Sequence, residues 1–175
     1  MTLGRAPRPA VELLGRHHNR AEFSCGKPAL DRYLKTQASQ DVKRRQATVL
    51  VVCEEPGASE IFGYFTITAS SMLLTSVPED VKIPATLVGR LAVDYRYARR
   101  GYGSFMLFHA AARAMAPEAP ASWALLVDPL DDDAAGWYSR LGFMHLEAPT
   151  RRMFIPLATI SSAVIAALKA SREPG

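Results

Sequence analysis

The sequence predicts an α/β domain with a central mixed sheet and helices packed on both faces. Short apolar, β-branched stretches alternate along the chain with segments whose apolar residues recur at helical spacing. No internal repeat or low-complexity stretch interrupts this alternation. The 175 residues suffice for one domain with a hydrophobic core and are too few for two domains of typical size. We therefore expect a single domain over 1–175, with a loose lead-in at 1–9 and an additional C-terminal helix or tail at 158–175.

The first half of the chain is expected to hold three strands and one long helix. The helix should run from Pro28 to about Lys43, because proline suits a first helical turn and Leu30, Leu34, Ala38 and Val42 are spaced to share a buried face. The other expected elements are strands at 10–14, 48–53 and 61–69, a hairpin turn at 55–59, and a loop or broken helix at 72–84.

The second half is expected to hold a central strand, two helices and a closing hairpin. Gly142 should end the second helix, and Asp131–Asp133 should favour its N-terminus. The expected elements are a strand at 87–93, a basic loop at 94–100, a glycine turn at 101–104, a helix at 105–115, a strand at 123–127, a helix at 134–140, a hairpin of 143–146 with 151–156, and a tail helix at 158–170.

Composition is that of an ordinary globular protein, with 49% hydrophobic and 22% charged residues. The net charge of +4 makes an anionic partner plausible without requiring one. Cys25 and Cys53 lack metal-site spacing and are expected to be free, buried thiols. Adjacent His17 and His18 have no nearby third ligand in the sequence, so we expect surface residues and no metal site. No signal peptide or membrane span is predicted, which indicates a cytoplasmic protein.

A glycine-bearing turn between the central strand and the next helix is the first functional candidate. Arg99 and Arg100 precede Gly101, Tyr102, Gly103 and Ser104. Free N–H groups at a helix start, next to guanidinium groups, suit a phosphate. Two glycines alone are weak evidence, and a tight connection with solvated arginines is the alternative. Met106 occupies the place of the third glycine that a dinucleotide fingerprint needs.

A second stretch, Trp137-Tyr138 followed by Gly142-Phe143, would by itself indicate only good packing. Together with the glycine turn, it resembles the GNAT N-acetyltransferases, which combine Arg/Gln-x-x-Gly-x-Gly/Ala with Phe-Tyr-x-x-x-Gly-Phe. Ala98 stands where that family has Arg or Gln. The resemblance implies the GNAT fold with a mostly antiparallel sheet, acetyl-coenzyme A as cofactor, and Tyr138 as the acid that protonates the leaving thiolate. It assigns coenzyme binding to Leu91, Ala92, Val93, Arg99, Arg100, Gly101, Tyr102, Gly103 and Ser104.

Further segments narrow the resemblance, which runs from about Phe23 to Pro156. Phe23–Gly26, Leu30–Leu34, Gly63–Phe65 and Gly89–Asp94 occur in the order found in the GNAT toxins of toxin–antitoxin pairs. Gly136 departs from them, because relatives often carry Asn there. The resemblance implies acetylation of the α-amino group of aminoacyl-tRNA, a block of translation, a small DNA-binding antitoxin of the ribbon-helix-helix type, and a homodimer.

The cationic side chains beyond those needed for one pyrophosphate are the candidates for binding the tRNA. The alternative is that these charge clusters are only solvated surface. These candidates are Lys43, Arg44, Arg45, Arg90, Arg96, Arg151 and Arg152. An α-amine titrates near about 7.7–8.0 and needs no dedicated base, unlike a lysine amine near about 10.4. Two alternatives stay open: an N-acetyltransferase acting on a small-molecule or peptide amine, and a binding module that has lost catalysis.

Overall fold

A computed structural model describes residues 9–74, 81–146 and 150–160. Their strands and helices are β1 (Ala10–Leu13), α1 (Pro28–Thr36), α2 (Ala38–Lys43), β2 (Thr48–Cys53), β3 (Gly63–Leu74), β4 (Val81–Val93), the 3-10 helix η1 (Tyr95–Tyr97), α3 (Tyr102–Ala114), β5 (Ala124–Val127), α4 (Asp132–Arg140), β6 (Met144–His145) and β7 (Met153–Pro156).

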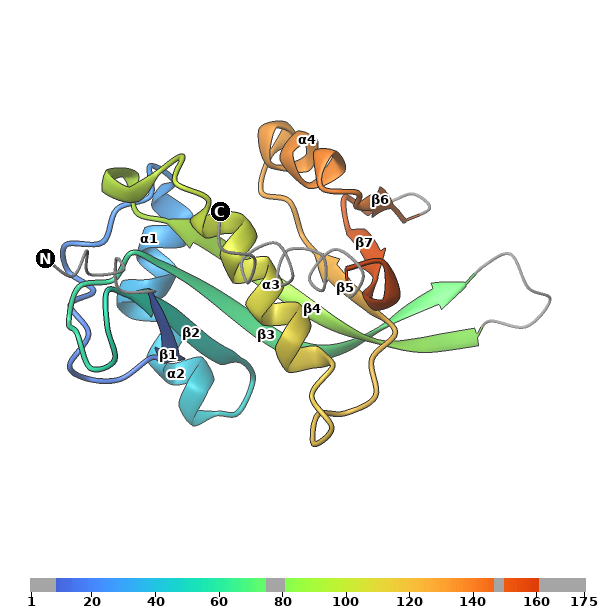
Figure 1. Ribbon diagram of the computed structural model, residues 1–175, viewed down its shortest axis with the longest axis horizontal. Helices are drawn as coiled ribbons and strands as arrows, with labels where there is room; N and C mark the ends of the chain where they lie inside the picture. Colours follow the sequence, from blue (N-terminus) through green and yellow to red (C-terminus); the bar gives the residue numbers. More distant parts are fainter. Residues whose placement is uncertain (1–8, 75–80, 147–149, 161–175) are drawn as a thin grey trace, which may run out of the picture. The chain divides into compact units, whose positions relative to one another are not determined.

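The described strands form one seven-stranded sheet in the order β1-β2-β3-β4-β5-β7-β6 (Figure 1). The pairs β1–β2, β2–β3, β5–β7 and β7–β6 are antiparallel, and β4–β5 is parallel. The predicted mixed, mostly antiparallel sheet with flanking helices is therefore confirmed. The residues group into two compact units, one reaching to Ile67 and including Arg90–Leu107, the other made of Thr68–Gly89 and the residues from Phe108 on. The expected single domain stays a prediction.

The core of the first unit lies between α1 and the strands β2 and β3. Tyr33 and Leu34 of α1 pack there with Val49, Val51 and Tyr64. This packing follows from the predicted helical spacing, because Leu34 lies one turn beyond Leu30 and both face the sheet.

The predicted single helix over 28–43 is wrong, because it is divided at Gln37. That residue has φ −119°, outside the helical range, so α1 ends at Thr36 and α2 restarts at Ala38. The interruption changes the helical phase, and Val42 is exposed instead of buried.

The loop predicted at 72–84 is also wrong, since β3 and β4 extend to Leu74 and back to Val81. Pro84 lies within β4, and its carbonyl accepts a hydrogen bond from the N–H of Trp123 at 2.9 Å. Proline lacks only the N–H, so it still offers this acceptor to a neighbour. In the second unit Met72 and Ala85 pack with Ala124 and Leu126.

Two further boundaries differ from the prediction. The helix after the glycine turn starts at Tyr102, so Tyr102, Gly103 and Ser104 form its first turn. The chain is helical at 157–160, and the remainder of the predicted tail helix lies outside the described residues. Cys25 and Cys53 are free, as predicted, but only Cys53 is buried, and Cys25 is half-buried. Among the described residues, every helix is too short or too polar to cross a lipid bilayer.

Candidate active site

The C-terminal end of β4 continues beyond its pairing with β5. The register of the two strands ends at Val88↔Val127, so the backbone of Leu91–Val93 belongs to no pair with β5. Ala92 is buried and Leu91 is half-buried. Unpaired N–H and C=O groups along a strand edge can hold an extended ligand as an additional strand.

Asp94, directly after β4, is a buried carboxylate that organises the following loop. Its side chain is fully buried and accepts hydrogen bonds from the Ser24 N–H at 3.2 Å, the Arg96 N–H at 2.9 Å, and the Arg96 guanidinium at 2.9 and 3.1 Å. Burial alone would raise the pKa of Asp94, but these hydrogen bonds and the positive charge of Arg96 lower it below its ordinary value. The ionised carboxylate thus joins the end of β4 to the loop before α1.

The rings of Phe62, Tyr97 and Tyr102 pack together at the basic loop 94–100. The Tyr97 ring stacks on Phe62 with centroids 3.9 Å apart, and Tyr102 meets both rings edge-on. The Tyr97 hydroxyl donates to Glu60 at 2.6 Å. Partial burial and this bond to Glu60 raise the pKa of Tyr97 to about 12. The guanidinium of Arg100 lies 5.5 Å from the Tyr97 centroid, which favours a cation–π contact.

The turn from Arg99 into α3 has the backbone geometry of an anion site. Arg99 has φ 62° and Gly101 has φ 84°, while Arg100 between them keeps a negative φ. Alternating backbone conformations of this kind turn successive N–H groups into one concavity. The Phe105 N–H reaches the Gly101 carbonyl at 3.0 Å, so the N–H groups before it start the helix without intrahelical acceptors.

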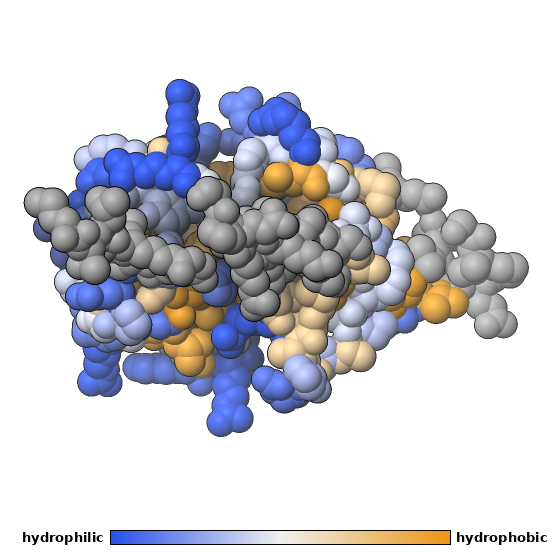
Figure 2. Space-filling view, viewed as in Figure 1, coloured by the Kyte–Doolittle hydropathy of each residue, from blue (hydrophilic) through white to orange (hydrophobic). Residues whose placement is uncertain are grey.

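The charge at this turn also favours an anion. Within the described part of the chain, Arg99 and Arg100 are exposed and form no ion pair. In the space-filling view the region of η1, at the upper left in Figure 1, carries hydrophilic surface (Figure 2). The predicted phosphate-binding residues 99–104 are thus contiguous and exposed or half-exposed, and within the described ranges neither arginine is paired with a carboxylate.

Gly63 permits a close approach that the sequence did not reveal. A Cβ at this position would lie 2.9 Å from the Ala92 carbonyl oxygen and 3.2 Å from the Met106 side chain. Only glycine lets β3 approach strand β4 and helix α3 this closely. No local sequence signal distinguishes this glycine from one in a turn.

In the second unit, Tyr138 lies on α4 inside an aromatic cluster. Asp131 caps this helix by accepting from the Ala134 N–H at 2.9 Å. The Tyr138 ring is buried and meets Trp137 and Phe143 edge-on, with centroids 4.9 and 5.3 Å away. Burial first, and the negative charge of Asp128 second, raise the pKa of Tyr138 above its ordinary value. The phenol is therefore protonated across the physiological range.

Three of the predicted RNA-contacting arginines are engaged within the protein. Arg96 pairs with Asp94 and Glu60, Arg152 binds Asp128 through two nitrogens at 2.8 and 3.1 Å, and Arg151 lies 3.5 Å from Asp132. The other predicted cations differ in setting. Lys43, Arg44 and Arg45 are exposed at the end of α2, and Arg90 is half-buried on β4.

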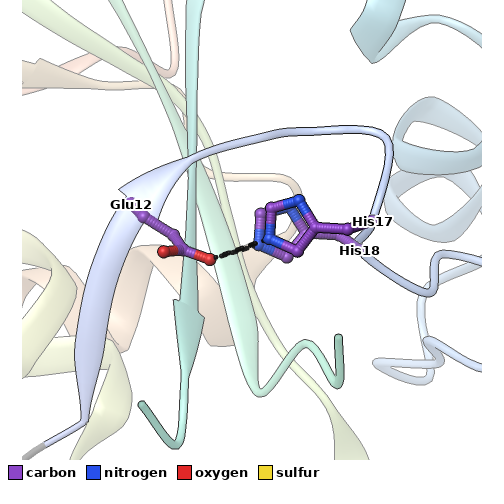
Figure 3. A group of neighbouring side chains, drawn as sticks. All are labelled: Glu12, His17 and His18. Carbon is purple, nitrogen blue, oxygen red and sulfur yellow. Dashed lines mark hydrogen bonds and ion pairs between the residues drawn. The ribbon is translucent and has the colours of Figure 1, made fainter. Parts of the chain in front are cut away.

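The two adjacent histidines form a hydrogen-bonded cluster with Glu12 (Figure 3). His17 is exposed as predicted, but His18 is buried, so the prediction of a surface residue is wrong there. The three side chains have ligand atoms close enough for a metal ion. However, the Gly15 N–H donates to His18 Nδ1 at 2.9 Å, which puts the proton on Nε2, where it bonds Glu12 at 2.6 Å. A metal at Nε2 would need the opposite tautomer, so this arrangement fits a structural hydrogen bond.

Comparison with known proteins agrees with this geometry. Residues 15–143 match the acetyltransferase (GNAT) family. The chain is 30% identical over 175 residues to a probable toxin TacT of Sinorhizobium fredii (strain NBRC 101917 / NGR234), covering 91% of this chain and 96% of the relative. It is also 30% identical over 128 residues to a tRNA-acetylating toxin of Mycobacterium tuberculosis (strain ATCC 25618 / H37Rv), covering 69% and 75%.

A solved structure shares the fold. It is an AtaT mutant toxin bound to the C-terminus of the antitoxin AtaR and acetyl-CoA, with TM-score 0.75 and 22% identity, covering 89% of this chain and 98% of that one. The GNAT fold expected from the sequence is confirmed by this match and by the family match.

Proposed function

The chain belongs to the acetyltransferase (GNAT) family, and from this premise we propose that it is a toxin that acetylates the α-amino group of aminoacyl-tRNA and blocks translation. The observation that carries the proposal is 30% identity, over 91% of the chain, to a relative named as a probable toxin, beside equal identity to one named as tRNA-acetylating.

The coenzyme is proposed to bind along the first unit, where the described residues fit its parts. The N–H groups of 101–104 and the guanidinium groups of Arg99 and Arg100 would hold the pyrophosphate. The free edge of Leu91–Val93 would hold the pantetheine arm, and its N–H groups can polarise a carbonyl. Arg99 and Arg100 would supply the contact that Ala98 lacks. When bound, acetyl-coenzyme A supplies the activated acetyl thioester.

Tyr138 is proposed to protonate the departing sulfur. An acid must hold its proton before the reaction, and the raised pKa of Tyr138 meets this condition. The acceptor amine needs no strong base, because an α-amine titrates near about 7.7–8.0 and its ester withdraws further electron density. The proposal therefore assigns one catalytic side chain, Tyr138, and leaves amine deprotonation to solvent.

Partners and location follow from the same relationship. We propose that the protein acts in the cytoplasm, forms a homodimer, and is neutralised by a small DNA-binding antitoxin of the ribbon-helix-helix type. The name of the TacT relative and the antitoxin bound to AtaT support an antitoxin partner. The exposed Lys43, Arg44 and Arg45 are proposed to attract the tRNA backbone.

A cell-free translation reaction tests this function. The wild-type protein should stop synthesis only when acetyl-coenzyme A is present, and fresh charged tRNA should restore it for a time. Tyr138→Phe is the matched control, because it removes only the hydroxyl and should leave translation nearly unaffected. Inhibition that does not depend on acetyl-coenzyme A, or equal inhibition by Tyr138→Phe, would exclude the proposed function. Charge reversal of Arg44 and Arg45 together should weaken inhibition without changing coenzyme affinity.

A further inference from the structure

The position of Arg90 separates it from the other arginines of the chain. Its guanidinium carbon lies 3.7 Å from the centroid of the Tyr33 ring, directly over the aromatic face. The residue is half-buried in β4, two positions before Ala92. A planar guanidinium stacked in this way keeps its N–H donors at the rim of the plane, where a ligand can reach them.

The support under Arg90 is rigid. Tyr33 is buried, its hydroxyl donates to Asp41 at 2.7 Å, and its ring runs nearly parallel to that of Tyr64. The main-chain N–H of Arg90 donates to the hydroxyl of Thr66 at 3.0 Å. Backbone and side chain are therefore both held before any ligand arrives, which lowers the entropy lost on binding.

No carboxylate in the described ranges forms an ion pair with Arg90. Arg96, six residues on, is by contrast saturated by Asp94 and Glu60. A fixed guanidinium fork without an internal anion matches phosphate geometry, because its parallel N–H donors can bind two oxygens. This setting indicates an external anion as the partner of Arg90.

The sheet face on which Arg90 lies indicates whether its partner is a phosphate of the coenzyme or of another ligand. Side chains two apart on a strand share a face, and Ala92 belongs to the same core cluster as Tyr33 of α1. On β3, a Cβ at Gly63 would face Met106 of α3, whereas the side chain of the next residue, Tyr64, packs in the core cluster with Tyr33 of α1. Arg90 thus lies on the α1 face, and α3, which starts at the proposed pyrophosphate-binding turn 101–104, packs on the other face.

Resting on the proposed function, we propose that Arg90 binds a backbone phosphate at the acceptor end of the charged tRNA. It would position the amino group for transfer and take no part in the chemistry. A tRNA carries phosphodiesters within a nucleotide or two of the esterified amino acid, whereas the coenzyme pyrophosphate has its own site on the opposite face.

Arg90→Gln tests this assignment with two acceptors, a charged tRNA and the same amino acid esterified to adenosine, which has no phosphate. Loss of a charge-assisted contact should lower kcat/KM for charged tRNA about 10–100-fold and reduce the slope of log affinity against log salt by about one. The adenosine ester and acetyl-coenzyme A affinity should be unaffected. Arg90→Lys keeps the charge and loses the fork, so it should fall between wild type and Arg90→Gln.

Arg32→Gln is the matched control, because Arg32 is an exposed arginine of α1 beside Tyr33 in the chain and has no assigned role. Equal losses on both acceptors would show that Arg90 only supports the fold and would overturn the assignment, and so would no loss on either. Weaker acetyl-coenzyme A binding would assign the phosphate to the coenzyme and also overturn it. Failure of the wild type to acetylate any charged tRNA would instead remove the proposed function itself.

Discussion

Asp94→Asn tests whether Asp94 is a buried carboxylate that positions the basic loop and not one half of an ordinary surface ion pair. The Asp94 side chain is fully buried and accepts from Ser24 and from the main chain and guanidinium of Arg96. Asparagine has nearly the same shape but only one acceptor oxygen, and its NH₂ group must face another donor. The change therefore leaves at least one buried N–H without a partner and removes the negative charge.

The size of the effect follows from which groups stay buried. The Arg96 side chain is 35% exposed, so water can satisfy part of its guanidinium. The Ser24 or Arg96 main-chain N–H cannot be satisfied as easily, and an unpaired buried donor costs about 1–3 kcal/mol. With the weakened charge-assisted bonds we expect a loss of about 2–4 kcal/mol in the free energy of unfolding. For a chain of this length that corresponds to about 5–15 °C in Tm.

Thermal and urea unfolding followed by circular dichroism would measure this loss, with coenzyme affinity by calorimetry beside it. Glu60→Gln is the matched control: it removes the charge of the other, 46% exposed partner of Arg96 and keeps a side-chain oxygen that can accept from the Tyr97 hydroxyl, so it should cost less than about 1 kcal/mol. Because the folded pKa of Asp94 is depressed, its contribution is present above the unfolded value near about 3.9 and is lost as the pH falls through the folded value. The variant should lack this part of the acid-induced loss.

The reasoning is refuted if Asp94→Asn unfolds with the wild-type midpoint, or if Glu60→Gln costs as much. A stable Asp94→Asn variant with unchanged coenzyme affinity would show that the basic loop keeps its geometry without this carboxylate. Coenzyme affinity should fall together with stability, because the loop carrying Arg99 and Arg100 continues directly from η1.

Three other predictions concern the same site. Gly63→Ala should cost about 1–3 kcal/mol of stability, measured by urea unfolding, because its Cβ would lie 2.9 Å from the Ala92 carbonyl oxygen; wild-type stability would contradict the close approach. Gly101→Asp should abolish acetyl-coenzyme A binding in calorimetry, whereas Gly101→Asn, which tolerates a positive φ and carries no charge, should keep most of it; equal affinities would remove the phosphate site. Because burial raises the pKa of Tyr138, the rate should show no decline below about pH 10 from phenol ionisation, and a phenol-dependent decline in the neutral range, absent in Tyr138→Phe, would contradict this.

Local patterns sufficed for much of the fold. β2 lies at an apolar, β-branched run and β5 at a short apolar run, and the proline at 28 and the aspartates at 131–133 mark helix starts. The extensions of β3 to Leu74 and of β4 back to Val81 were missed because Pro84 argues locally against a strand, and pairing with neighbours outweighs that propensity. The break at Gln37 was missed because nothing in the local sequence opposes a continuous helix there.

The candidate site likewise has residues that local motifs predict and contacts that only the tertiary fold creates. Gly101 and Tyr138 could be proposed as site residues because the roles that the resemblance gives them depend on residue type within a short motif. Asp94 could have been predicted to bond the N–H two residues on, a common use of aspartate in turns. Its bond to Ser24 spans 70 residues, and the stack of Arg90 on Tyr33 joins a strand to a distant helix. Such contacts depend on the tertiary fold, so one sequence could not show which arginines are paired internally and which have no internal carboxylate partner among the described residues.

Direct acetylation of charged tRNA tests the central claim. Purified protein is incubated with acetyl-labelled acetyl-coenzyme A and a pool of charged tRNA, the tRNA is recovered, and the ester is cleaved by mild base. The account predicts label in N-acetyl amino acids released from the tRNA, with a rate about 10²–10⁴-fold lower for Tyr138→Phe. It is contradicted if the wild-type protein leaves every charged tRNA unlabelled while it efficiently acetylates a free amine in the same buffer.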